Sequence, residues 1–221
     1  MLTLSLGRLP GQMRTLLCLG AHCDDIEIGC GGTVLRLVER YPDLYVHWVV
    51  LSSSPVRAAE ARASAERFLH TVRHKDVVIK EFRNSFFPFV GAQIKEFFEE
   101  LKARVAPDLV LTHARGDLHQ DHRLTSELTW NTFRDHFILE HEIPKYDGDL
   151  GTPTVFVPLE HSHCEAKVAH ILEFFPSQHD KPWFTRDTFM ALMRLRGVES
   201  NAPSGYAEAF YCRKAVLGLS P

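Results

Sequence analysis

The sequence lacks the features that would tie it to a membrane, to nucleic acid or to an oxidising compartment. No apolar run approaches the ~20 residues of a membrane span, and Arg8, Pro10 and Gly11 interrupt the N-terminal segment too early for a good secretory signal. The formal net charge of −3 favours neither nucleic acid nor an anionic membrane surface as a partner. The five cysteines are odd in number and form no CxxC pair, so we expect free thiols in a cytoplasmic protein.

What the sequence does contain is an alternation of strand and helix patterns. In the first half, strands are expected at 14–22, 44–54, 76–82 and 107–114, and helices at 31–41, 54–72 and 91–105. Short apolar strands separated by amphipathic helices predict an α/β fold with a Rossmann-like, doubly wound, mainly parallel sheet. Ser54 can cap the second of these helices, and Pro55 suits its first position.

The second half is less regular, but it contains no repeat, low-complexity tract or linker that would divide the chain. Helices are expected at 121–137, 162–175 and 185–198, and strands at 138–147, 153–159 and 206–216. Ser162 and Glu165 form a capping-box pattern. We therefore expect a single domain at residues 13–221, preceded by a loose leader at residues 1–12.

Two of the expected strands end in clusters of polar side chains. The first strand leads into "AHCDD" at 21–25, and the fourth leads into "THARGDLHQDHR" at 112–123. Ligands of open parallel sheets bind outside the carboxyl ends of the strands, so neighbouring strands would make both segments face one pocket. A solvated turn or a helix start explains either segment alone, whereas the two together favour a functional site.

These side chains suit a catalytic zinc site, which uses three protein ligands and leaves one position for water. His22 and Asp25, three residues apart, can supply two ligands, and His119 or His122 can supply the third. Adjacent side chains diverge, so Asp24 is available for a different task beside the same cation. The cation would offset the repulsion between the two carboxylates.

The same residues resemble the signatures of a known family. "AHCDDIEIGCGG" is similar to "AHPDDxExGxGG", and "DLHQDHR" is similar to "HPDHR" or "HQDHR", the two metal motifs of the LmbE-like, or PIG-L, zinc-dependent de-N-acetylases. "VRAAEARASAERFL", "FFPSQH" and "GYAEAF" resemble weaker motifs of that family, so the likeness covers most of the chain. It implies a zinc-dependent hydrolase that removes an N-acetyl group from an amino-sugar-containing small molecule, such as a sugar, glycoside or sugar nucleotide.

The resemblance also implies a role for individual residues. The zinc ligands, or those of another divalent transition metal, would be His22, Asp25 and His122. Asp24 would be the general base, and His119 would stabilise the oxyanion or protonate the leaving amine. Asp121 would orient a metal-binding histidine, and Arg57 would hold the N-acylated substrate.

Cys23 departs from the family pattern, which has proline at this position. Proline restricts the backbone and the residue before it, so we expect a less rigid loop here. A soft metal ligand or a nucleophile paired with His22 is a different interpretation of Cys23. It is disfavoured because neighbouring side chains at a strand end point apart and Cys–His pairs normally come from separated segments.

Other functions remain in competition with deacetylation. A carbamoyl or other amide-like bond could be hydrolysed by the same site, and a non-catalytic binding protein could share the fold. A dinucleotide-dependent oxidoreductase is disfavoured, because it needs G-x-G-x-x-G directly after the first strand and the acidic groups here would repel a pyrophosphate. The apolar, aromatic middle segment is compatible with a homo-oligomer.

Three further segments contain residues that could mimic a site. The cluster His161, His163, Cys164 and His170 does not have the spacing of a closed zinc site, so a helix start is expected there. His136 and His141 are expected in a surface segment. The phenylalanines of "EFRNSFFPFVG" at 81–91 are expected mostly in the core, with one or two on a pocket wall against a sugar.

Overall fold

The structure, a computed structural model, describes residues 13–216 and contains one seven-stranded sheet. The strands are β1 (Thr15–Gly20), β2 (Tyr45–Val50), β3 (His74–Ile79), β4 (Leu109–His113), β5 (Phe137–His141), β6 (Val155–Pro158) and β7 (Ala207–Tyr211). Their order is β3-β2-β1-β4-β5-β7-β6. Strands β1 to β5 pair in parallel, whereas β7 is antiparallel to both β5 and β6. The predicted mainly parallel sheet is confirmed; the predicted leader at 1–12 lies outside the described residues.

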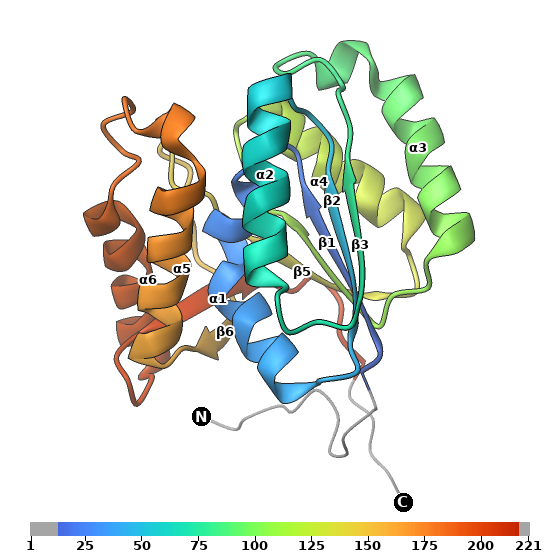
Figure 1. Ribbon diagram of the computed structural model, residues 1–221. Helices are drawn as coiled ribbons and strands as arrows, with labels where there is room; N and C mark the ends of the chain where they lie inside the picture. Colours follow the sequence, from blue (N-terminus) through green and yellow to red (C-terminus); the bar gives the residue numbers. More distant parts are fainter. Residues whose placement is uncertain (1–12, 217–221) are drawn as a thin grey trace, which may run out of the picture.

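Helices cover both faces of the sheet (Figure 1). They are α1 (Asp25–Arg40), α2 (Pro55–Phe68), α3 (Gly91–Arg104), α4 (Gln120–Thr132), α5 (His161–Phe174) and α6 (Arg186–Ser200), with short 3-10 turns η1 (Phe87–Phe89) and η2 (Pro176–Gln178). Successive strand residues point to opposite faces. Leu16 and Cys18 of β1 therefore pack into the core under α1, α2, α5 and α6, while Leu17 and Leu19 pack into the core under α3 and α4.

The strand order places a topological switch point between β1 and β4. The chain runs outward from β1 through β2 to β3, and then returns to place β4 on the other side of β1. The connections that leave β1 and β4 therefore diverge to opposite faces, which opens a crevice at the carboxyl ends of these strands. The two polar segments predicted from the sequence lie at this crevice.

Helix α1 begins at Asp25, so the predicted start at residue 31 is wrong. Asp25 and Glu27 lie in its first turn, where carboxylates interact favourably with the helix dipole. Gly29 and Gly32 lie inside this helix, and side chains of other elements approach both of them closely. A Cβ on Gly29 would lie 2.3 Å from Nδ1 of His141, and one on Gly32 would lie 2.5 Å from Cδ1 of Leu159.

Other helix boundaries confirm or correct the sequence patterns. Ser54 caps α2 by accepting a hydrogen bond from the backbone N–H of Arg57, and Pro55 is the first residue of that helix, as predicted. Helix α5 begins at His161, so Ser162 is inside it and does not cap it. Helix α4 ends at Thr132, before the predicted end at residue 137, and β5 forms at residues 137–141, where a strand was predicted from residue 138. No helix within residues 13–216 has the length and apolarity to cross a membrane.

Candidate active site

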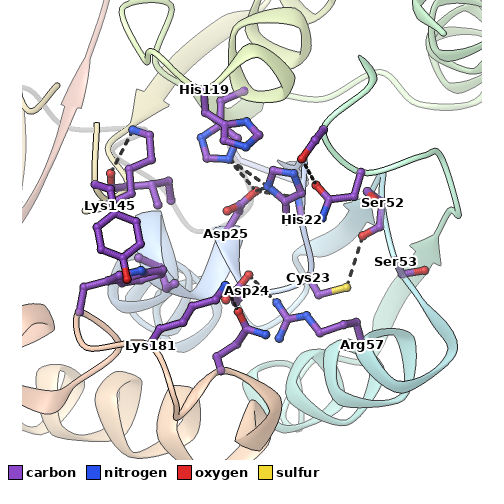
Figure 2. Close-up of a pocket in the computed structure, with 18 of the residues that line it drawn as sticks. His22, Cys23, Asp24, Asp25, Ser52, Ser53, Arg57, His119, Lys145 and Lys181 are labelled. Atoms are coloured by element: carbon purple, nitrogen blue, oxygen red, sulfur yellow. Dashed lines mark hydrogen bonds and ion pairs between the residues drawn. The ribbon is translucent and has the colours of Figure 1, made fainter. Parts of the chain in front are cut away.

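The two polar segments lie together at the switch point. His22 is in the turn after β1, Asp24 is the N-cap of α1, and Asp25 is the first residue of that helix. His119 is the N-cap of α4, and His122 lies in its first turn. Because β1 and β4 are paired neighbours, all five residues line one cavity of about 450 Å³ (Figure 2).

Three of these side chains direct ligand atoms at one point. Oδ2 of Asp25 lies 3.3 Å from Nδ1 of His22 and 3.5 Å from Nε2 of His122, and the two ring nitrogens are 3.1 Å apart. Zinc binds N and O ligands at roughly 2.0–2.2 Å in tetrahedral geometry, which separates neighbouring ligand atoms by about 3.3 Å. The donor types and their spacing therefore fit zinc or a similar divalent metal.

Metal-ligand side chains gather only here among residues 13–216. The two groups found share one residue, and they are His22–His119–His122 and Asp25–His113–His122. The histidine-rich stretch at 161–170 forms a helix, as predicted. It contributes to neither of these groups.

A carboxylate contacts the second nitrogen of each histidine in the triangle. Oδ2 of Asp121 lies 3.2 Å from Nε2 of His22, and this carboxylate also accepts hydrogen bonds from two backbone N–H groups in the segment before α3. Oδ2 of Asp117 lies 2.8 Å from Nδ1 of His122. Such contacts fix the tautomer and orientation of metal-binding imidazoles. The sequence pointed to Asp121 for this position but assigned no role to Asp117, whose only signal was its place in the polar segment.

The adjacent aspartates have opposite electrostatic environments. Burial disfavours charge on Asp25, but three neighbouring histidines outweigh it and hold the pKa of this carboxyl well below its usual range. Burial raises the pKa of Asp24, and the Arg57 guanidinium offsets this only in part. A carboxylate that stays charged suits a metal ligand, whereas one with a raised pKa suits a proton acceptor.

Arg57, predicted to hold the substrate, points its guanidinium at Asp24. Nη2 of Arg57 donates to Oδ1 of Asp24 at 2.8 Å, and Nη1 donates to Oε2 of Glu60 at 3.1 Å and to Oγ of Ser177 at 3.2 Å. The guanidinium also lies 5.2 Å from the ring centre of Phe175. Arg57 borders the cavity and links Asp24 to η2, and its contact with a substrate stays a prediction.

The sequence comparison places the chain in a family. The family model described as PIG-L: GlcNAc-PI de-N-acetylase matches residues 17–133, which is more than half of the chain. The chain belongs to the PIG-L family. A search of curated proteins gave no match.

Solved structures share the fold of this PIG-L chain. The conserved protein TT1542 from Thermus thermophilus has a TM-score of 0.74 and 21% identity, covering 94% of this chain and 98% of that one. N,N'-diacetylchitobiose deacetylase from Pyrococcus horikoshii has a TM-score of 0.66 and 18% identity, covering 90% and 84%. GalB, a 4-carboxy-2-hydroxymuconate hydratase from Pseudomonas putida KT2440, has a TM-score of 0.66 and 16% identity, covering 95% and 100%.

Cys23 stands where the PIG-L motif has proline, and its side chain is turned away from the candidate metal ligands. Its Sγ donates to the backbone carbonyl of Ser52 at 3.4 Å, which ties the turn after β1 to the segment after β2. Burial raises the pKa of the Cys23 thiol to about 12. A thiol that stays protonated is neither a good ligand nor a nucleophile.

His141 is fully buried, so the prediction that it belongs to a surface segment is wrong. It lies in β5 directly beside His113 of β4, because the two strands pair in register at these residues. The rings of His113 and His141 have centres 4.7 Å apart, and His113 stacks on His122 at 4.0 Å. Burial, followed by the charge of His122, lowers the pKa of His113 to about 4, so this ring packs as a neutral group behind the site.

The aromatic side chains that border the cavity differ from those expected. Phe87 is buried, but Phe89 is 80% exposed, and no phenylalanine of the segment 81–91 lines the cavity. The aromatic rings on the cavity wall instead belong to Tyr146, in the loop after β5, and Trp183, in the loop before α6. Both loops lie in the half of the chain whose sequence was least regular.

Proposed function

We propose that this protein is a zinc-dependent hydrolase that removes an N-acetyl group from an amino-sugar-containing small molecule, releasing acetate and a free amine. The observation that carries the proposal is the triangle of His22, Asp25 and His122, with Asp24 beside it. Membership of the PIG-L family supports the same chemistry. The fold alone does not, because a hydratase shares it.

A divalent metal at these ligands would polarise the amide carbonyl and lower the pKa of water. Asp24, next in the chain to the ligand Asp25, accepts the proton of the attacking water. Its raised pKa brings it closer to neutral pH, where a general base is most effective. Arg57 holds the Asp24 carboxylate in place.

His119 is suited to stabilise the oxyanion and to protonate the leaving amine. Its Nδ1 accepts a hydrogen bond from the backbone N–H of Asp121 at 3.2 Å, so Nε2 carries the proton in the neutral ring. Burial, with the charge of His22, lowers the pKa of His119. The ring is therefore a hydrogen-bond donor even when neutral, and it readily releases a proton when charged.

The cavity wall suits a neutral or zwitterionic sugar. The cationic residues Arg57, Lys145 and Lys181 that line it all contact protein acceptors. Tyr146 and Trp183 provide aromatic faces, and a volume of about 450 Å³ is in the range of small-molecule sites.

The test measures free amine released from a panel of N-acetylated sugars by the metal-free protein and by the same protein after addition of zinc. We expect release only with metal. Asp24→Asn should retain zinc and lower kcat by about 10²–10⁴-fold, the typical contribution of a general base. The control is Asp43→Asn, an exposed aspartate outside the cavity, which should match the wild type. Near-normal turnover of zinc-loaded Asp24→Asn, or no gain from zinc, would contradict the proposal.

A further inference from the structure

Lys145 is a buried cation between two carboxylates at the edge of the cavity. Its ammonium lies 3.0 Å from Oδ2 of Asp117 and 2.5 Å from Oδ2 of Asp149. The side chains are only 9%, 3% and 5% exposed, respectively. Figure 2 shows Lys145 across the cavity from Arg57. Of the three side chains in this ion-pair network, Asp117 also contacts the candidate metal ligand His122.

The network connects two loops. Asp117 contacts His122 through Oδ2 and accepts the backbone N–H of His119 at 2.8 Å through Oδ1. Asp149 accepts the backbone N–H of Leu118 at 2.7 Å. Two consecutive backbone N–H groups of the loop between β4 and α4, those of Leu118 and His119, therefore donate to carboxylates that pair with Lys145. Lys145 belongs to the loop between β5 and β6, so one ammonium joins both loops.

We propose that Lys145 is a positioning residue that sets the affinity of the site for its metal by fixing Asp117 against the ligand His122. The inference rests on the metal site of the proposed function, but not on the identity of the substrate. Lys145 is separated from His122 by one carboxylate only, and its own ammonium is held away from the triangle by its two partners.

Two effects oppose each other when the ammonium is removed. A free Asp117 carboxylate would be a stronger acceptor for His122, which would favour metal binding. Against this, the buried carboxylates of Asp117 and Asp149 would lose the cation that they share. Burial of unpaired charge is strongly unfavourable. One of them must turn away or lose its charge. Since Asp117 is 3% exposed, we expect the second effect to dominate and His122 to lose its anionic partner.

Lys145 also connects the metal to the substrate cavity. The next residues, Tyr146 and Asp147, line the same cavity as the ligands. A substrate that orders this loop would therefore strengthen metal binding through Lys145, and the metal would strengthen substrate binding by the same factor. A residue that only stabilised the loop would change the unfolding temperature without changing the coupling between metal binding and substrate binding.

The experiment measures the Kd of Zn²⁺ by competition with a chromophoric chelator, without substrate. Loss of the contact that orients a metal-binding histidine typically weakens affinity about 10–100-fold, and we expect this for Lys145→Met and for Asp117→Asn. Their double variant should be no weaker than the more affected single variant. Lys145→Arg, which keeps the cation, should restore most of the affinity. Replacement of zinc by Co²⁺ should give a shifted visible absorption spectrum in Lys145→Met but not in Lys145→Arg.

Lys181→Met is the matched control, because Lys181 lines the same cavity but contacts Gln178 instead of an acidic network. It should leave the Kd of Zn²⁺ unchanged. Lys145→Gln provides a second neutral variant if Lys145→Met does not fold, as judged by circular dichroism. A folded neutral variant with wild-type affinity and cobalt spectrum would overturn the inference, as would an equal loss in Lys181→Met. If no N-acetylated sugar is cleaved but Lys145→Met still weakens zinc binding, the proposed activity fails and this inference stands.

Discussion

At the scale of single residues, the site separates two aspartates that are adjacent in the chain. Asp25 faces a group of histidines, which keep it charged, and Asp24 faces Arg57 in a buried position, where its pKa is raised. The sequence motif placed both carboxylates at the strand end, but only the packing of α2 against α1 brings Arg57 to Asp24. A guanidinium beside the candidate base gives a pH-dependent prediction.

Arg57→Met should move the acidic limb of the kcat/KM profile to higher pH. The Arg57 charge lowers the pKa of Asp24 and partly offsets burial, so its removal raises that pKa further. Because Asp24 accepts a proton only when ionised, activity is then lost at a higher pH as the solution is acidified. An opposite charge at this distance typically shifts a carboxyl pKa by about one to three units. Measurement of kcat/KM at a series of pH values with zinc-loaded protein locates the acidic limb. The control is Arg62→Met, which changes an exposed arginine of the same helix. If the acidic limb of Arg57→Met lies at the same pH as in the wild type, Arg57 does not affect the pKa of the general base.

At the scale of elements, helix α1 connects the candidate metal ligand Asp25 to the core. Its glycines allow β5 and the segment after β6 to approach the helix closely. Gly29 faces His141, which packs against His113 and through it against His122. A side chain at position 29 would therefore displace His141 and, through it, the rings of His113 and His122.

Gly29→Ala should destabilise the fold, whereas Gly91→Ala should not. An added Cβ at Gly29 would lie 2.3 Å from Nδ1 of His141, and overpacking of this kind costs about 1–3 kcal/mol of unfolding free energy. At Gly91, the first residue of α3, the closest atom would be 3.7 Å away, so the reduced freedom of the unfolded chain should add about 0.4–1 kcal/mol of stability. Urea denaturation compares the two variants. Equal free energies of unfolding for the two variants would mean that α1 and β5 shift to accommodate the added methyl group at little cost.

Local patterns were enough to predict the strands, most helices and the two segments that meet at the site. They did not show the neighbours of each element. The start of α1 was placed too late because a glycine-rich helix and a loop look alike in sequence, and the difference comes from the packed partner. His141 was assigned to the surface because the pairing of β5 with β4 depends on the strand order. Asp117 and Lys145 were not connected because their contact requires the fold of two irregular loops.

At the scale of the whole molecule, a buried ion pair joins helix α1 to α5 and to the last strand, β7. Nζ of Lys167, in α5, donates to Oε1 of Glu208 and to the carbonyl of Ile28, both at 2.7 Å. The Glu208 carboxylate, in β7, accepts the backbone N–H groups of Gly32 and Thr33 at 2.8 and 2.6 Å. Both side chains are 3% exposed. The pair thus satisfies polar groups in the middle of α1 and fixes the position of this helix against α5 and β7.

Glu208→Gln should lower the free energy of unfolding by about 3–5 kcal/mol, because it leaves the buried Lys167 ammonium without its counter-charge. In a chain of this size each kcal/mol lowers Tm by roughly 2–4 °C. The double variant Lys167→Met with Glu208→Gln should recover part of the loss, since it removes the unpaired charge as well. Glu66→Gln breaks the ion pair of a half-exposed carboxylate with Lys75 and should cost no more than about 1 kcal/mol. Chemical denaturation of the wild type, of Lys167→Met and Glu208→Gln as single variants, and of their double variant gives the coupling energy. If the effects of the single variants at positions 167 and 208 simply add, the pair does not act as a unit, and the attachment of α1 to β7 must come from the backbone hydrogen bonds to Glu208 and from apolar packing.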